Sequence, residues 1–251
     1  ILVTGPTGSG KTTTLYSALK SRATTDVNCI TIEDPIEMVI EDFNQVEVNR
    51  KAGITFASAL RTALRQDPDI IMVGEIRDQE TAQNAIQAAL TGHLVMSTLH
   101  TNDSPSSITR LIDLGIEPFL VGSSLVAIVA QRLVRRVCPI CRFERPLARD
   151  EASALGLQLP EGGDHPLMLS EGKGCPACRG TGLSGRIGVF EVMAVSDAIR
   201  HLIAERADGP KLMRVARREG MMTLRESAIR RMLDGETTFG EVLRVTAEAP
   251  G

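Results

Sequence analysis

Residues 1–12 read Ile-Leu-Val-Thr-Gly-Pro-Thr-Gly-Ser-Gly-Lys-Thr, and this stretch decides the fold. Gly5 to Thr12 match G-x-x-x-x-G-K-[ST], and the apolar run in front of them predicts a strand that leads into the loop. The glycines allow a tight turn whose backbone N–H groups point at a phosphate chain, and the helix expected to follow adds its positive end. A glycine-rich turn with a chance lysine is the alternative. The strand–loop–helix context favours a nucleoside triphosphate site.

Two side chains of this loop are expected to contact the phosphates or Mg²⁺ of a bound nucleotide. Lys11 can reach the β- and γ-phosphates, and the Thr12 hydroxyl can bind Mg²⁺. We therefore expect contacts with the nucleotide from Gly5, Pro6, Thr7, Gly8, Ser9, Gly10, Lys11, Thr12 and Thr13.

Composition is that of an ordinary globular protein. The chain has 251 residues, of which 43% are hydrophobic and 24% charged, and its net charge is −3. The acidic balance argues against a broad surface for nucleic acid. The longest apolar region, 119–130, is too short and too interrupted to span a bilayer. Because the chain begins inside the first expected strand, without a methionine, we expect it to be part of a longer protein.

Strands and helices are predicted to alternate along residues 1–134. Such alternation is typical of an α/β fold with a mostly parallel sheet. Strands are expected at 1–3, 28–32, 70–73 and 94–98. Helices are expected at 12–22, 55–66, 80–91, 104–114 and 118–134, the last apolar on most faces and therefore buried.

Acidic residues follow two of these strands. Glu33, Asp34 and Glu37 come after the strand at 28–32, where open α/β sheets place their ligands. A solvated acidic turn is the alternative, but beside a phosphate site an acid can orient or deprotonate the attacking water. After the strand at 70–73 comes Gly74 and then Glu75, so we expect Glu75 to act on Mg²⁺ or its water shell.

Two histidines bracket the strand at 94–98. A lone histidine is more often structural than chemical. The pair His93 and His100, at an edge expected to face phosphate, favours a role in sensing the γ-phosphate.

Four of the five cysteines form two C-P-x-C pairs. Cys138 and Cys141, with Cys175 and Cys178, can complete a closed tetrahedral site of four thiolates, which is structural rather than catalytic. Disulfides are the alternative, but no export signal is visible. The stretch between the pairs, with Pro160, Gly162 and Gly163, is expected to be a surface excursion. Cys29 is expected to be a small core residue.

Beyond residue 193 we expect three short helices, at 196–206, 210–219 and 223–234. This end is locally basic, which indicates either a solvated helix face or contact with an acidic partner or a neighbouring subunit. The arginines concerned are Arg214, Arg217, Arg218, Arg225, Arg230 and Arg231.

Taken together, these blocks resemble the ATPases of type II secretion and type IV pilus assembly. The resemblance covers most of residues 1–137, and pilus-retraction motors of the family generally lack the paired cysteines. The matching blocks are 5–12, Thr31-Ile-Glu-Asp-Pro-Ile-Glu37, 66–78, Thr91-Gly-His-Leu-Val-Met-Ser-Thr-Leu-His100 and Gln131-Arg132-Leu133.

The resemblance implies a RecA-like P-loop core and assigns roles within it. Glu37 would be the catalytic glutamate that activates water, Glu33 and Glu75 would act on Mg²⁺, and His93 and His100 would contact the γ-phosphate. The expected domains are a core at 1–137 with a truncated first strand, a zinc-knuckle subdomain at 138–192 and a helical subdomain at 193–251. Candidates for salt bridges between blocks or subunits are Arg61, Arg65, Arg77 and Arg110.

The family resemblance also implies a biological setting. The family works as a cytoplasmic homohexamer, peripheral at the inner membrane, and uses ATP, Mg²⁺ and a structural Zn²⁺ to drive pseudopilus or pilus assembly through membrane-platform partners. A DNA-uptake ATPase of the same family would share every block. A further alternative is a zinc-stabilised module whose binding of nucleic acid is controlled by ATP. Its six phenylalanines and one tyrosine offer few aromatic side chains on which bases could stack.

Overall fold

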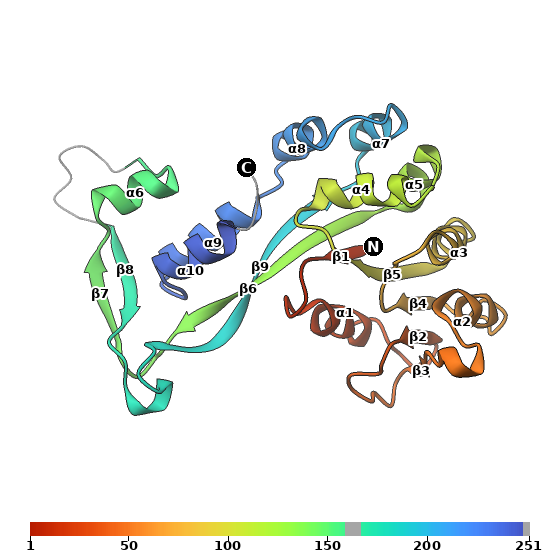
Figure 1. Cartoon of the computed structure of the whole chain (residues 1–251), viewed down its shortest axis with the longest axis horizontal. Coiled ribbons are helices and arrows are strands. Elements are labelled where there is room, and N and C mark those ends of the chain that lie inside the picture. Colours follow the sequence, from red (N-terminus) through yellow and green to blue (C-terminus); the bar gives the residue numbers. More distant parts are fainter. Residues whose placement is uncertain (159–166, 248–251) are drawn as a thin grey trace. The chain divides into compact units, whose positions relative to one another are not determined.

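The computed structural model describes residues 1–158 and 167–247 and divides the chain into two compact units. The first unit holds residues 1–131 and 191–221, and the second holds 132–190 and 222–251 (Figure 1). Two strands, β6 (Ala127–Val137) and β9 (Leu183–Ala194), run from one unit into the other. The division into three domains drawn from the sequence stays a prediction.

A seven-stranded sheet organises the first unit. Its order is β3-β2-β4-β5-β1-β6-β9, and the neighbouring strands from β3 to β6 all pair in parallel. The parallel α/β fold is therefore confirmed. Its first strands are β1 (Leu2–Thr4), β2 (Cys29–Glu33), β3 (Asn44–Glu47), β4 (Ile70–Val73) and β5 (Leu94–Leu99).

Helices cover both faces of this sheet because successive strand residues point to opposite sides. Leu2 and Ile71 belong to one apolar cluster, with α2 (Phe56–Ala63) and α3 (Gln79–Leu90). Their neighbours Val3 and Met72 belong to another, with α1 (Lys11–Lys20) and the buried Cys29. The remaining helices of the unit are α4 (Ser104–Asp113), α5 (Pro118–Ser124), α7 (Asp197–Ala204), α8 (Gly209–Arg218) and a short 3₁₀ turn, η1 (Arg50–Ala52).

The expected buried helix at 118–134 is wrong over its second half. Helix α5 ends at Ser124, and β6 begins at Ala127 and continues to Val137. Gly122, Ser123 and Ser124 are poor helix formers, and the run after them contains β-branched residues that suit a strand. Apolar residues continue on both sides of Gly122, Ser123 and Ser124, so the apolar pattern alone does not reveal this change from helix to strand.

The second unit combines a hairpin with helices. Strands β7 (Arg142–Pro146) and β8 (Met168–Gly172) pair antiparallel, with Arg142 opposite Gly172. The surface excursion expected at Pro160, Gly162 and Gly163 lies outside the described residues. The helical elements are α6 (Arg149–Leu155), η2 (Pro176–Cys178), α9 (Leu224–Leu233) and α10 (Phe239–Thr246).

Glu241 is a buried carboxylate that joins α10 to β6. It is 2% exposed and accepts hydrogen bonds from the backbone and guanidinium of Arg135, at 2.7 and 2.9 Å, and from Arg244 at 2.8 Å. Burial alone would raise the pKa of Glu241, but the hydrogen bonds from Arg244 and Arg135 outweigh it and lower the pKa to about 2.

Replacing Glu241 with glutamine is expected to destabilise this unit by about 2 kcal/mol at neutral pH, since hydrogen bonds to a buried charge are lost. A carboxylate with a lowered folded-state pKa contributes stability above its ordinary pKa of 4.5, and this contribution disappears as the pH falls towards 2. Denaturant titrations of both proteins from pH 7 to pH 2 measure the effect. Curves that stay equally far apart across that range would contradict it.

Within the described residues, no helix combines the length and apolar character needed to cross a membrane.

Candidate functional site

The loop Gly5 to Gly10 connects β1 to α1 and has the geometry of a phosphate cradle. Gly8 and Gly10 have φ of 77° and 88°, a region that favours glycine. Gly10 occupies the N-cap of α1, and no side chain of the described residues caps that helix. The first backbone N–H groups of α1 are therefore suited to bind an anion.

The side chains of Lys11 and Thr12 make hydrogen bonds beside this loop. Lys11 Nζ donates to the carbonyl oxygens of Gly5 at 2.9 Å and Pro6 at 3.1 Å, which holds the ammonium against the loop. Thr12 Oγ1 donates to Glu37 Oε1 at 3.3 Å. The structure thus brings the acid implied as the general base to the hydroxyl implied as the Mg²⁺ ligand.

Parallel pairing gathers the other acids at the same edge. Because β2, β4, β5 and β1 are parallel neighbours, their carboxyl ends lie together, at the edge from which the loop emerges. Glu33 is the last residue of β2, Glu75 follows β4 by two residues and His100 follows β5 directly. Three predicted site residues therefore share one edge with the P-loop.

Glu75 makes two contacts at this edge. Its Oε2 lies 2.6 Å from Arg77 Nε and 3.5 Å from His100 Nε2. The side chain of Glu75 is only 12% exposed to solvent, whereas the side chains of His100 and Arg77 are exposed. The structure therefore holds Glu75 between Arg77 and His100 at this edge, and the roles of Glu75 towards Mg²⁺ and of His100 towards the γ-phosphate stay predictions.

His93 lies elsewhere. It directly precedes β5, whereas the P-loop follows β1, and these two strands are parallel. The six residues of β5 run from His93 to the edge that carries the P-loop, so His93 lies about 20 Å from that edge. Its Nδ1 instead contacts Ala88 O at 3.0 Å and Thr91 Oγ1 at 3.2 Å at the end of α3. A direct contact of His93 with phosphate on this chain's own P-loop does not fit that placement.

The four candidate arginines do not form one cluster. Arg61 on α2 pairs with Glu80 in the first turn of α3, so it links two helices. Arg77 pairs with Glu75, as described above. Arg65 and Arg110 are exposed, the second of them on α4. Their roles between subunits stay predictions.

Gln131 is a site residue whose role sequence reasoning missed. It is 2% exposed, its Nε2 donates to Ser9 O in the P-loop at 2.8 Å, and its Oε1 accepts from Thr14 Oγ1 on α1 at 2.8 Å. One amide from β6 therefore fixes the loop to its helix. In the sequence, the run Gln131-Arg132-Leu133 stands out only through the family resemblance, and the helix predicted over 118–134 conceals its place in the sheet.

Replacing Gln131 with alanine is expected to weaken ATP binding about tenfold, because the hydrogen bonds to Ser9 and Thr14 are worth roughly 1–2 kcal/mol together. Titration with a fluorescent ATP analogue measures the affinity. Thr14→Val is the matched control, since it removes the bond to Thr14 and leaves the bond to Ser9, and it should lose less. An unchanged affinity in Gln131→Ala would show that the P-loop holds its shape without this residue.

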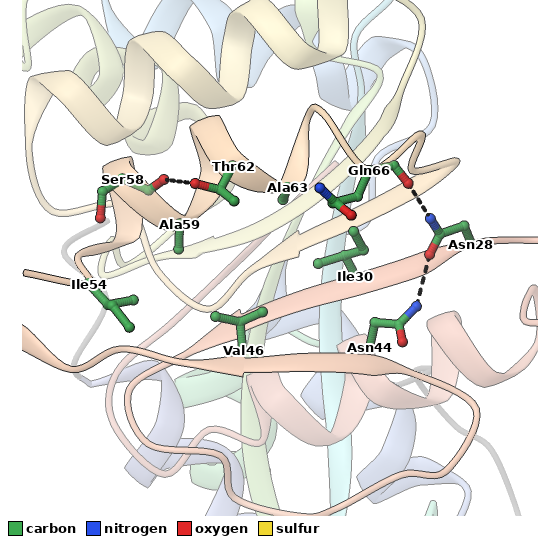
Figure 2. Close-up of a pocket in the computed structure, with 10 residues that line it drawn as sticks. All are labelled: Asn28, Ile30, Asn44, Val46, Ile54, Ser58, Ala59, Thr62, Ala63 and Gln66. Carbon is green, nitrogen blue, oxygen red and sulfur yellow. Dashed lines mark hydrogen bonds between the residues drawn. The ribbon is translucent and has the colours of Figure 1, made fainter. Parts of the chain in front are cut away.

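A hollow of about 520 Å³ lies away from this edge (Figure 2). It is lined by α2 and by the faces of β2 and β3, and the Asn28 side chain there bonds to Gln66 O and to Asn44. None of the predicted site residues lines it. The hollow is therefore separate from the phosphate cradle.

The second unit brings the four cysteines into one cluster. All four sulfur atoms lie within 4.8 Å of one another, and three separations are 3.7, 3.8 and 3.9 Å. A tetrahedron with Zn–S bonds of 2.3 Å has sulfur atoms about 3.8 Å apart. The cysteines are free thiols, and disulfide sulfurs would be about 2 Å apart. The residues present therefore fit a metal ion.

Backbone N–H groups support the thiolate form that a metal requires. The amides of Cys175 and Gly182 donate to Cys178 Sγ at 3.1 and 3.2 Å. These hydrogen bonds lower the pKa of the Cys178 thiol to about 6.

Comparison with known proteins now identifies the family. A family model described as "Type II/IV secretion system protein" matches residues 1–244. The chain belongs to this family. The type II/IV secretion system family includes relatives that are about half identical to this chain over nearly all of its length.

Three such relatives come from different bacteria. The type IV pilus assembly ATPase TfpB of Acinetobacter baylyi is 51% identical over 98% of this chain, and PilB of Thermus thermophilus is 51% identical over 98%. The type II secretion system protein HxcR of Pseudomonas aeruginosa is 49% identical over 99%. The chain spans 42%, 28% and 49% of their respective lengths.

Solved structures show the same fold. The pilus retraction motor PilT, solved with bound ADP, matches with a TM-score of 0.71 and 33% identity over 100% of this chain and 61% of its own. The ATPase DotB of Legionella pneumophila matches with a TM-score of 0.69 at 24% identity, over 99% of this chain and 60% of its own, and so supports the fold alone.

Proposed function

We propose that this chain binds ATP on Gly5–Thr12 and hydrolyses it, as part of a motor that assembles a type IV pilus or a type II secretion pseudopilus. The observation that carries the proposal is the hydrogen bond from Thr12 Oγ1 to Glu37 Oε1 at 3.3 Å. It places a carboxylate beside the hydroxyl at which the terminal phosphates are expected. The named relatives are pilus-assembly and secretion proteins.

Each residue of the site has a distinct task in this proposal. The P-loop N–H groups and Lys11 bind the β- and γ-phosphates and stabilise the charge that develops on them. Glu37 orients the attacking water and accepts its proton. Mg²⁺, held by Thr12 and by Glu75 or its water shell, would neutralise the phosphate oxygens. His100 contacts the γ-phosphate. Loss of that contact after hydrolysis changes the conformation of the segment that follows β5.

The wider setting is part of the same proposal. The chain works in the cytoplasm within a homohexamer, at an inner-membrane platform, with nucleotide near the contacts between subunits. The cysteine cluster holds a structural Zn²⁺ and has no open position for catalysis. Its task is to fix the second unit.

Mg²⁺-dependent phosphate release measured against protein concentration tests this proposal. Turnover that rises more steeply than linearly, and is absent in Lys11→Ala, is the result expected for an ATPase that needs assembly. A chain that binds no ATP, or a Lys11→Ala variant as active as the original, would overturn the proposal.

A further inference from the structure

Glu33 is a carboxylate that the protein itself has surrounded with donors. It is 3% exposed. Its Oε1 accepts from Thr31 Oγ1 at 2.6 Å and from Gln45 Nε2 at 3.0 Å, and its Oε2 accepts from the Tyr16 hydroxyl. Burying a charge is costly unless hydrogen bonds compensate, and three donors from three elements do so here.

Gln45 on β3 extends this network into the loop that carries Glu37. Its Nε2 also donates to Met38 O at 3.0 Å, and its Oε1 accepts from Ile40 N at 2.7 Å. The side-chain amide thus mimics a backbone partner for the segment that directly follows Glu37. Glu33 in turn holds the Gln45 amide in the orientation that both loop contacts require.

Tyr16 connects the same network to the nucleotide-binding helix. It lies four residues after Thr12, on the same face of α1. Its ring packs edge-on against Phe43 at 6.2 Å, and Ile40 and Phe43 are both buried in the cluster that contains Tyr16. Burial and the hydrogen bond to Glu33 raise the pKa of Tyr16 above its ordinary value, so the phenol stays a donor at neutral pH.

The loop is therefore fixed on both sides of Glu37. Before it, Asp34 pairs with Arg50 at 3.1 Å, and after it, Met38 and Ile40 are held by Gln45. Between these anchors Glu37 is exposed and reaches Thr12. We propose that Glu33, Tyr16 and Gln45 are positioning residues that hold the Glu37 loop against α1, and that Glu33 is not a Mg²⁺ ligand.

This inference rests on the proposed function, since it concerns the same site. It replaces the role in Mg²⁺ binding that the family resemblance implied for Glu33. A metal ligand must present an accessible lone pair, whereas three of the roughly four lone-pair sites of the Glu33 carboxylate already accept bonds from Thr31, Gln45 and Tyr16, and the residue is buried. Coordination to Mg²⁺ would compete with the loop anchor.

Hydrogen exchange and the Mg²⁺ dependence of ATP binding test the inference on the full chain. In Tyr16→Phe, Glu33→Gln and Gln45→Ala, amides of residues 38–43 should exchange at least tenfold faster, while the Mg²⁺ concentration for half-maximal ATP binding stays within twofold. Where turnover is measured, kcat should fall about tenfold, and the KM for ATP should stay unchanged. Asn44→Ala, the neighbouring change on β3, is the control and should alter none of these.

The opposite pattern would overturn it. If Glu33→Gln raises the half-saturating Mg²⁺ concentration tenfold and leaves exchange at 38–43 unchanged, Glu33 is a metal ligand. Because Tyr16 is the single tyrosine and the chain has no tryptophan, its fluorescence gives a separate readout: emission quenched by the carboxylate should rise in Glu33→Gln. Exchange and fluorescence need no hydrolysis, so a chain that failed to turn over ATP would sink the proposed function and leave this inference standing or falling on its own data.

Discussion

Replacing Glu37 with glutamine is expected to lower Mg²⁺-dependent ATP turnover by about 10²–10⁴-fold, which is the usual contribution of a positioned general base. Glutamine keeps the shape of the side chain and its hydrogen bond from Thr12, but it cannot accept the proton of the attacking water. ATP affinity should therefore stay within a few-fold of the original. Phosphate release and ATP binding, measured on the same preparation, separate the two effects.

Glu41→Gln is the matched control for this change. Glu41 is an exposed acid of the same loop, four residues further on, and its loss alters the net charge equally. We expect turnover in this variant to be nearly unchanged. A Glu37→Gln protein that hydrolyses ATP at the original rate would show that another group activates the water.

Replacing Cys138 with serine is expected to have the largest effect on stability. The zinc content should fall from about one ion per chain to near zero, and the melting temperature should fall by roughly 10 °C or more, because metal binding contributes directly to folding. Metal analysis of the purified protein and a thermal scan measure both. Treating the original protein with a chelator should reproduce the shift.

Cys29→Ala provides the comparison. Cys29 is the cysteine outside the cluster and is packed in the core beside β4, so its loss should cost a modest amount of stability and no zinc. If Cys138→Ser keeps its metal and its melting temperature, the cluster is not a structural zinc site.

Much of the first unit could be predicted from its sequence because its signals are local. The P-loop glycines and the short β-branched strands each specify their own conformation, and parallel pairing then places Glu33, Glu75 and His100 at one edge. The same logic could not place His93 correctly without attention to strand direction. A residue before a strand and a residue after it lie at opposite edges of a sheet.

What could not be predicted depends on contacts between distant segments. Gln131 meets Ser9 across 122 positions, and Glu241 meets Arg135 across 106. Neither pairing has a periodic signal. Glu33 is the clearest case, because the family resemblance implied a metal ligand, whereas its burial among Tyr16 and Gln45 depends on the packing of α1 and β3.

The most direct test of the central claim is the identity of the nucleotide that each protein retains after incubation with ATP and Mg²⁺ and rapid removal of free nucleotide. The original chain should retain ADP, Glu37→Gln should retain ATP, and Lys11→Ala should retain neither. Chromatography of the released nucleotide distinguishes these three results. If the original chain and Glu37→Gln retain the same unhydrolysed ATP, or if Lys11→Ala retains as much nucleotide as the others, the assignment of this site as a hydrolytic P-loop centre is contradicted.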